Sequence, residues 1–102
     1  MTSTDLESRS PEARARTFAA LGDRNRIEIL DLLGIAEQCV CDLQQALEIA
    51  PNLLSYHLRV LREAGLVEGT RRGRWVDYRL AGDAQQIIAA GLPGILSRGV
   101  EA

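Results

Sequence analysis

The chain has 102 residues and a mass of 11.2 kDa, which is room for one domain. Hydrophobic residues make up 46% of the chain and charged residues 25%, as in an ordinary globular protein, so wholesale disorder is excluded. The two cysteines, Cys39 and Cys41, are too close in sequence to staple a secreted disulfide scaffold. No apolar run is long enough to span a membrane, so we expect a cytoplasmic protein without a membrane partner.

The net charge of −2 conceals a basic segment. Residues 1–51 carry five Arg and nine acidic residues, whereas residues 52–80 carry six Arg and three acidic residues. A basic segment inside an acidic chain predicts a local contact with nucleic acid.

Capping and turn residues divide the chain in the order helix, helix, helix, helix, hairpin, helix. Residues 1–10 are expected to form a disordered tail before a single folded domain, residues 11–98. Ser, Asp and Pro at helix starts and Gly at helix stops predict the helices, with expected spans of 11–21, 24–34, 42–47, 51–64 and 84–96. Two short strands on either side of Arg71-Arg72-Gly73 predict a hairpin. Short helices followed by a basic hairpin predict a winged helix-turn-helix, mainly α with a small β-hairpin.

The fourth helix has two faces when its residues are projected at about 100° per residue. One arc is polar and the opposite side is apolar. The polar arc contains Asn52, Ser55, Tyr56, Arg59, Arg62 and Glu63. The apolar side contains Leu53, Leu54, Leu58, Val60, Leu61 and Ala64.

The polar arc and the basic turn are the candidate DNA-binding residues. Hydrogen-bonding and cationic side chains of this kind suit base edges and phosphates. We expect the helix to enter the major groove and the turn to reach the DNA backbone or the minor groove. The candidates are Asn52, Ser55, Tyr56, Arg59 and Arg62 on the helix and Arg71, Arg72 and Arg74 on the turn.

Three other side chains have predicted environments. His57 projects onto the apolar side of the fourth helix, so we expect it to form a hydrogen bond within the core and not to bind a metal. Trp75 and Tyr78 lie on opposite faces of the second strand of the hairpin, so only one of them is expected to pack inward.

Apolar residues of the first and last helices exceed what so small a core can cover, which predicts a homodimer. They are Phe18, Leu21, Ile87, Ile88, Leu92 and Ile95. A two-fold dimer would place two copies of the fourth helix and hairpin on an inverted repeat of double-stranded operator DNA.

Three motifs in the same order resemble the ArsR/SmtB family of winged-helix metalloregulators. Residues 54–67 (LSYHLRVLREAGLV) are similar to its recognition helix, residues 21–27 (LGDRNRI) to the start of its second helix, and residues 73–80 (GRWVDYRL) to its wing. The resemblance covers roughly residues 15–85 and implies a homodimeric repressor that leaves its operator when a metal or metalloid binds. Residues 50–53 depart from the family pattern, which often has a Ser at this helix start.

Residues 37–43 (EQCVCDL) hold both cysteines and are a candidate site for a soft cation. On a regular helix, residues two apart point about 200° apart, so Cys39 and Cys41 could share an ion only where the chain is extended at the start of a helix. We expect the helix N-terminus to lower the pKa of these cysteines. The segment resembles the thiolate box of the arsenite- and cadmium/lead-responsive branches of the family.

Two thiolates fit As(III) or Sb(III) better than Cd²⁺ or Pb²⁺, which usually take more sulfur donors. Relatives often have a third Cys where this chain has Gln44, and residues 1–22 supply no further Cys. Glu37 or Asp42 could offer an oxygen to a harder ion. The second metal site known in the family, on the last helix, needs His ligands that are missing here.

The sequence therefore predicts a transcriptional repressor that releases DNA when As(III) or Sb(III) binds Cys39 and Cys41. The alternatives are a cadmium- or lead-responsive repressor, a thiol-redox repressor in which the two cysteines are oxidised, and a winged helix that binds only protein. No nucleophile, base and pocket occur together, so we do not expect an enzyme.

Overall fold

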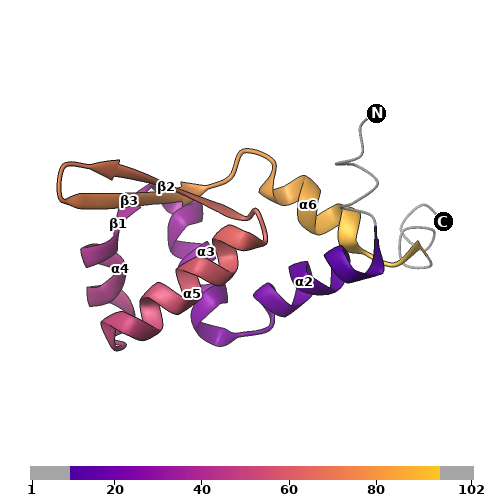
Figure 1. Cartoon of the computed structure of the whole chain (residues 1–102), viewed down its shortest axis with the longest axis horizontal. Coiled ribbons are helices and arrows are strands. Elements are labelled where there is room, and N and C mark those ends of the chain that lie inside the picture. Colours follow the sequence, from indigo (N-terminus) through magenta and orange to yellow (C-terminus); the bar gives the residue numbers. More distant parts are fainter. Residues whose placement is uncertain (1–9, 95–102) are drawn as a thin grey trace.

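The computed structural model describes residues 10–94, and Figure 1 shows their arrangement. The described elements are α2 (Pro11–Leu21), α3 (Arg24–Ile35), β1 (Gln38–Cys39), α4 (Val40–Leu47), α5 (Pro51–Glu63), β2 (Val67–Arg72), β3 (Trp75–Leu80) and α6 (Ala84–Gly91). The predicted tail before Ser10 lies outside the described residues, as do Ile95 and Leu96. The last helix ends earlier than the predicted residue 96, because α6 stops at Gly91 and the chain is extended at Leu92, before Pro93.

Side chains cap the first two of these helices as the sequence predicts. The Ser10 hydroxyl accepts a hydrogen bond from the backbone N–H of Ala13, and the Asp23 carboxylate accepts two, from Asn25 and Arg26. Helix α3 continues through Gly34 and ends at Ile35, one residue later than predicted.

The sheet has three strands in the order β1-β3-β2, where the sequence analysis predicted only the β2–β3 hairpin. A two-residue turn joins β2 to β3, and its first residue, Gly73, has a φ of +62° that favours glycine. Strand β1 pairs antiparallel with the other edge of β3, opposite Tyr78 and Asp77. A strand of two residues is too short to show hydrophobic alternation, so it could not be predicted from the sequence.

The core lies between the helix-turn-helix and the inner face of the sheet. Its fully buried side chains come from α2, α3, α4, α5, the residue before β2 and the start of β2; the largest are Ile29, Leu43, Leu54, Leu61, Leu66 and Val67. Tyr78 packs into this core, whereas Trp75 is half exposed on the other face of β3, which confirms that only one of the two packs inward. The ring of Tyr78 lies against Gly69, where an added Cβ would come within 2.9 Å of it.

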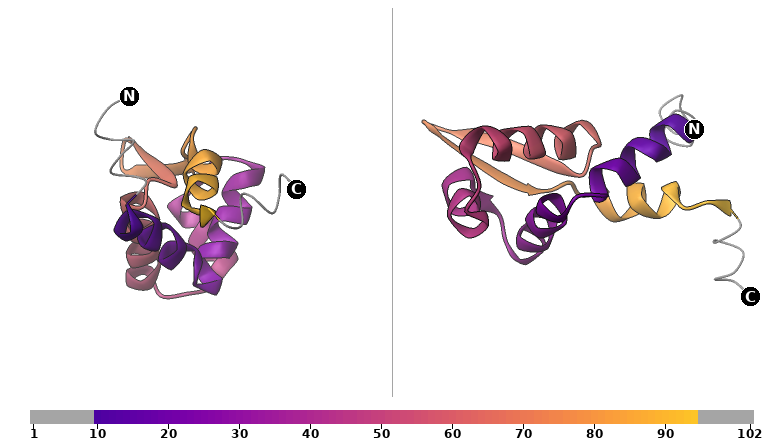
Figure 2. Two further views of the ribbon diagram at one scale, coloured as in Figure 1. Left: turned by 90° about the vertical axis from the view of Figure 1, so that its right-hand side faces the viewer. Right: turned by 90° about the horizontal axis from the view of Figure 1, so that it is seen from below.

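Helices α2 and α6 pack against each other at the end of the molecule opposite the hairpin (Figures 1 and 2). Phe18 of α2 packs against Gly91 of α6, yet it remains 38% exposed, and Leu92 remains 37% exposed. No helix between residues 10 and 94 combines the length and the hydropathy that crossing a membrane requires.

Candidate DNA-binding face and thiol pair

Helices α4 and α5 form a helix-turn-helix through a short connection, residues 48–50. Glu48 ends α4 in the left-handed region with a φ of 55°, and the Gln44 side chain donates a hydrogen bond to the carbonyl oxygen of Ile49. Gln44, which stands where relatives were expected to have a third Cys, therefore stabilises the turn between α4 and α5.

Helix α5 presents its predicted polar arc to solvent. Every member of the arc is exposed: Asn52, Ser55, Tyr56, Arg59, Arg62 and Glu63. The Arg59 guanidinium lies 5.8 Å from the centre of the Tyr56 ring. Leu53, which was predicted to lie on the apolar side, is 39% exposed, whereas its neighbour Leu54 is buried.

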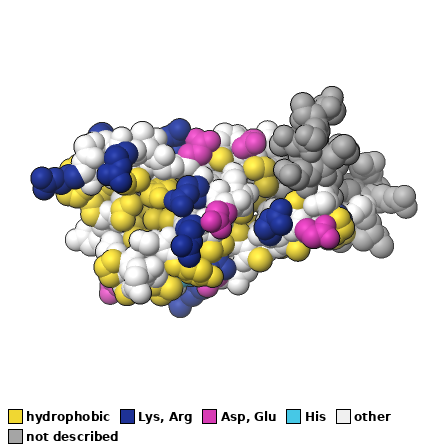
Figure 3. Space-filling view, in the orientation of Figure 1, with side chains coloured by type: hydrophobic (Ala, Val, Ile, Leu, Met, Phe, Trp, Pro, Cys, Tyr) yellow, Lys and Arg dark blue, Asp and Glu magenta, His cyan; other side chains and the backbone are white. Residues whose placement is uncertain are grey.

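We call the hairpin (β2, β3 and their turn) the wing. The three arginines at its turn fall into two groups. Arg71 and Arg74 are exposed, and no hydrogen bond or ion pair joins their side chains to another residue within the described chain. Arg72 donates two hydrogen bonds to Asp77, of 2.8 and 3.2 Å. Basic side chains mark the wing end and the middle of the face seen in Figure 3.

The Arg72–Asp77 pair is bidentate, because its two hydrogen bonds join one planar guanidinium to both oxygens of one carboxylate. Hydrogen bonding from Arg72 holds the pKa of Asp77 below its usual range and raises the pKa of Arg72. Asp77 was not among the predicted site residues. An acidic residue in the middle of a strand is unfavourable, and that was the available sign of a special role.

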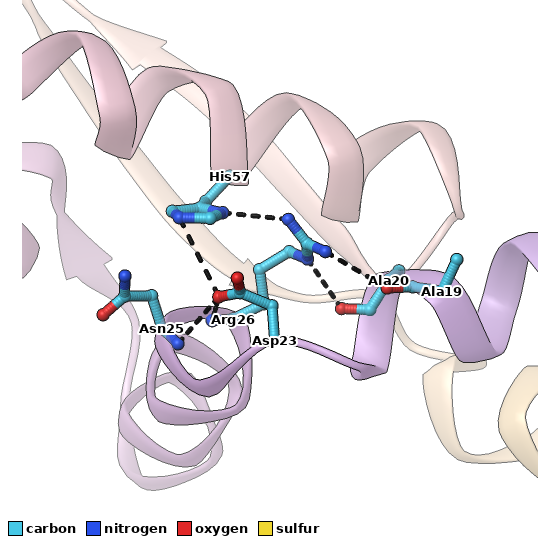
Figure 4. Close-up of polar contacts among 6 residues, drawn as sticks. All are labelled: Ala19, Ala20, Asp23, Asn25, Arg26 and His57. Atoms are coloured by element: carbon cyan, nitrogen blue, oxygen red, sulfur yellow. Dashed lines mark hydrogen bonds and ion pairs between the residues drawn. The ribbon is translucent and has the colours of Figure 1, made fainter.

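His57 connects α5 to the junction of α2 and α3 (Figure 4). The ring is 3% exposed, and its Nδ1 lies 2.9 Å from the Arg26 guanidinium, which has only donors, so Nδ1 accepts the hydrogen bond. This confirms the predicted hydrogen bond within the core. The Nε2 atom faces the Asp23 carboxylate at 3.8 Å.

Arg26 completes this contact, which we call the His57 corner (Asp23, Arg26 and His57). Its guanidinium also donates to the carbonyl oxygens of Ala20, at 2.8 Å, and Ala19, at 3.1 Å, at the end of α2. Burial works against ionisation of Asp23, but the backbone N–H groups of Arg26 and Asn25 and the nearby charge of Arg26 outweigh it and lower the pKa of that carboxyl. The sequence analysis did not predict the role of Arg26, which only the tertiary fold brings to His57.

Cys39 and Cys41, the thiol pair, converge at the start of α4. Cys39 is the extended N-cap residue of the helix, and its sulfur lies 2.7 Å from that of Cys41 in the first turn. The Cys39 sulfur also accepts a hydrogen bond from the N–H of Asp42, at 3.3 Å. The prediction that an extended residue at a helix start brings the two sulfurs together is confirmed.

The expected effect of the helix N-terminus on the thiol pair is wrong for Cys39. Its pKa is raised, because the hydrogen bond shared with Cys41 favours the protonated thiol more than the Asp42 N–H favours the thiolate. The nearby Asp42 carboxylate acts in the same direction as Cys41. A ligand of the pair must therefore displace a firmly held proton.

The donor set fits a soft, thiophilic ligand. One ligand atom from each of Cys39, Cys41 and Asp42 lies within 4.8 Å of the others, and within residues 10–94 this is the only group of three such residues. Cys41 is exposed and Cys39 is partly exposed, so a ligand can reach both sulfurs. Two sulfurs and one carboxylate oxygen suit As(III), Sb(III) or, with the oxygen included, a larger divalent cation.

Comparison with known proteins supplies relatives for this arrangement. The family model of bacterial regulatory proteins, arsR family, matches residues 23–69. The arsenic resistance transcriptional regulator ArsR1 of Pseudomonas putida is 39% identical over 85 residues, which are 82% of this chain and 66% of that protein. A cadmium resistance transcriptional regulatory protein, the CadC homologue of Staphylococcus aureus, is 35% identical over 77 residues, 74% of this chain and 64% of that one.

A solved structure is also similar over most of the chain. The solution structure of the homodimeric winged helix-turn-helix DNA-binding domain of a possible ArsR-family regulator from Mycobacterium bovis has a TM-score of 0.69 and 33% identity, covering 88% of this chain and 79% of that one. The matched stretches span 51–66% of the lengths of the first four curated relatives.

The fold and the exposed polar face of α5 therefore define a winged helix-turn-helix of the kind that regulators of this family contain. The chain belongs to the ArsR family of bacterial regulatory proteins.

Proposed function

We propose that this chain is a transcriptional repressor that binds operator DNA as a homodimer and releases it when As(III) or Sb(III) binds Cys39 and Cys41. The convergence of the two sulfurs at 2.7 Å carries the proposal, because it occurs in the first helix of the helix-turn-helix. Such a regulator acts where the chromosome is, in the cytoplasm.

The chemistry requires no oxidant. Arsenite, As(OH)₃, reacts with two thiols to form two As–S bonds, and two As–O bonds break as each displaced hydroxide leaves with a thiol proton as water. The third position keeps a hydroxide or takes a small thiol, and Asp42 lies close enough to contribute a carboxylate oxygen.

Ligand binding weakens DNA binding if it favours a different packing of α4 against α5. A ligand shifts such an equilibrium only by its differential affinity for the two states, typically about 1–3 kcal/mol. Two independent sites in a dimer would contribute about 2–6 kcal/mol, which lowers operator affinity about thirtyfold or more.

The homodimer would form through α2 and α6, away from the wing. The partly exposed Phe18 and Leu92 lie on these helices, and a similar domain from Mycobacterium bovis is described as homodimeric. With two-fold symmetry, two α5 helices would address the half-sites of an inverted repeat.

On the DNA, α5 would read the major groove through Asn52, Ser55, Tyr56 and Arg59. The cations Arg62, Arg71, Arg72 and Arg74 would contact the backbone or the minor groove. Arg71→Ala should lower the slope of log affinity against log salt by about one. Arg79→Gln is the control, because Arg79 lies toward the end of β3 away from the turn of the wing, opposite Glu68 and paired with it at 2.9 Å, so it should change the slope little.

The test is fluorescence anisotropy on a labelled duplex selected from a random library by the protein itself. We expect arsenite to release the wild-type chain and to leave the Cys41→Ser chain bound. Release of Cys41→Ser at wild-type arsenite concentrations would exclude the thiol pair as the sensor.

A second candidate ligand is Cd²⁺ or Pb²⁺, favoured by the Asp42 oxygen beside the two sulfurs. Release by Cd²⁺ but not by arsenite, and its loss in Asp42→Asn, would establish this candidate. Release by diamide that dithiothreitol reverses, with no response to either ion, would instead establish a redox sensor.

A further inference from the structure

Cys39 and Asp77 form a cross-strand pair. Residues Cys39 of β1 and Thr70 of β2 lie opposite Asp77 of β3, one on each side. Opposite residues of antiparallel strands point to the same face, with their Cβ atoms about 4.5–5.5 Å apart. The thiol pair therefore lies at one edge of a row of side chains that crosses the outer face of the sheet.

Asp77 is also the partner of a wing arginine. Its carboxylate accepts both hydrogen bonds of Arg72, which lies diagonally across from it and ends strand β2. The Arg72 side chain is 66% exposed, whereas that of Asp77 is 17% exposed, so the carboxylate is the more fixed member of the pair. Strand β3 sets the position of the Asp77 carboxylate, and β1 pairs with β3 at Asp77 itself.

This ion pair has little part in holding the fold together. An ion pair at the protein surface adds little to stability, and Arg72 lies on the outer face, away from the core formed around Tyr78. What the pair does determine is the direction of a guanidinium next to the turn of the wing.

We propose that Asp77 is the positioning residue through which the thiol pair acts on the wing, in addition to any change in α4. In the ligand-free chain, Asp77 holds Arg72 in one orientation for contact with DNA. A ligand that fixes the two sulfurs at Cys39 and Cys41 displaces β1 against β3, the Asp77 carboxylate moves with its strand, and Arg72 loses that orientation. This inference rests on the proposed function and adds a route from the ligand to the DNA.

The wing offers a matched control in its second ion pair. Glu68 of β2 pairs with Arg79 of β3 at 2.9 Å, on the same face of the sheet as Arg72 and Asp77. Arg79 lies two residues beyond Asp77 along β3, where β1 no longer pairs with that strand. Asp77→Asn and Glu68→Gln each remove one carboxylate charge from the wing with nearly unchanged shape. Loss of a charge should therefore raise the basal DNA affinity of Glu68→Gln by about threefold or less, whereas in Asp77→Asn the lost orientation of Arg72 offsets this gain.

The experiment measures the coupling, defined as the ratio of DNA dissociation constants with and without saturating arsenite, for wild type and both variants. Arsenite binding is measured separately by the loss of free thiols. We expect Asp77→Asn to bind arsenite like wild type but to reduce the coupling about fivefold, and Glu68→Gln to keep the wild-type coupling. Circular dichroism of both variants checks that each remains folded.

Wild-type coupling in Asp77→Asn would overturn this inference and leave the proposed function intact. An equal loss of coupling in Glu68→Gln would also overturn it, because the effect would then follow from wing charge alone. If arsenite binds no thiols and releases no DNA in wild type, both the proposed function and this inference fail.

Discussion

The His57 corner and the thiol pair both contact the helix-turn-helix, but they differ in how completely their polar groups are satisfied. At the His57 corner, one guanidinium donates to two carbonyl oxygens and to a ring nitrogen of a side chain that is 3% exposed. At the thiol pair, two accessible sulfurs share one hydrogen bond and accept one from the backbone. The His57 corner therefore fixes α5 against α2 and α3. The thiol pair provides, at the start of α4, two donor atoms that a ligand can bind.

This difference suggests that the His57 corner stabilises the fold and that the thiol pair provides the response to ligand. Buried groups with all hydrogen bonds made are costly to disturb. Thiols at a surface helix start add little to stability and keep their reactivity. Substitutions at the first corner should therefore change the free energy of unfolding, and substitutions at the second should change the response to ligand.

The largest expected effect is that of Arg26→Ala. Loss of the guanidinium leaves His57 Nδ1 and the carbonyl oxygen of Ala20 without this donor and the carbonyl oxygen of Ala19 with only the N–H of Gly22, and we expect the free energy of unfolding to fall by about 2–4 kcal/mol. Urea denaturation measures this change. Arg24→Ala, at an exposed position two residues earlier, is the control and should stay within about 0.5 kcal/mol of wild type. Equal stability of the two variants would show that the corner is not a structural clamp.

A pH titration separates the candidate ligands of the thiol pair. The pKa of Cys39 is raised, so its thiol is protonated at neutral pH, and a divalent cation must release that proton to bind. Cd²⁺ affinity should therefore rise with pH, about tenfold per unit from Cys39 alone, until the pH reaches its pKa. Arsenite should bind almost equally from pH 6 to pH 8, because the displaced proton leaves as water. Calorimetry at several pH values measures both, and a Cd²⁺ affinity independent of pH would contradict the raised pKa.

The smallest expected effect distinguishes the capping role of Cys39 from its role in sensing. Serine is a preferred N-cap, so Cys39→Ser should keep the hydrogen bond from the Asp42 N–H and change stability by less than about 0.5 kcal/mol. Cys39→Ala loses the cap and should lose about 1 kcal/mol. Thermal denaturation compares the two, and both should lose the arsenite response. A Cys39→Ser chain as unstable as Cys39→Ala would mean that the sulfur contributes more than a cap.

Local signals predicted most of the fold. Capping residues such as Ser10 and Asp23, the Gly73 turn and the two faces of α5 each depend on a few neighbouring residues, and the structure confirms them. Convergence of Cys39 and Cys41 was predictable for the same reason, since both lie within one helix start.

Features that depend on distant parts of the chain were missed. Strand β1 exists because β3 offers it an edge, and Asp77 becomes important only through the register that this pairing sets. Arg26 and His57 are 31 residues apart and meet only after α3 and α5 pack. The pKa of Cys39 was predicted in the wrong direction because the helix N-terminus was weighed without the second thiol.

The most direct test of the central claim is a single titration of the DNA-bound chain with arsenite, in which free thiols and DNA anisotropy are measured in the same samples. We predict that the two thiols of each chain disappear together, that DNA release follows their loss in proportion, and that both changes are complete at one arsenite per chain. Release of DNA while both thiols remain free would contradict the claim that Cys39 and Cys41 are the sensor.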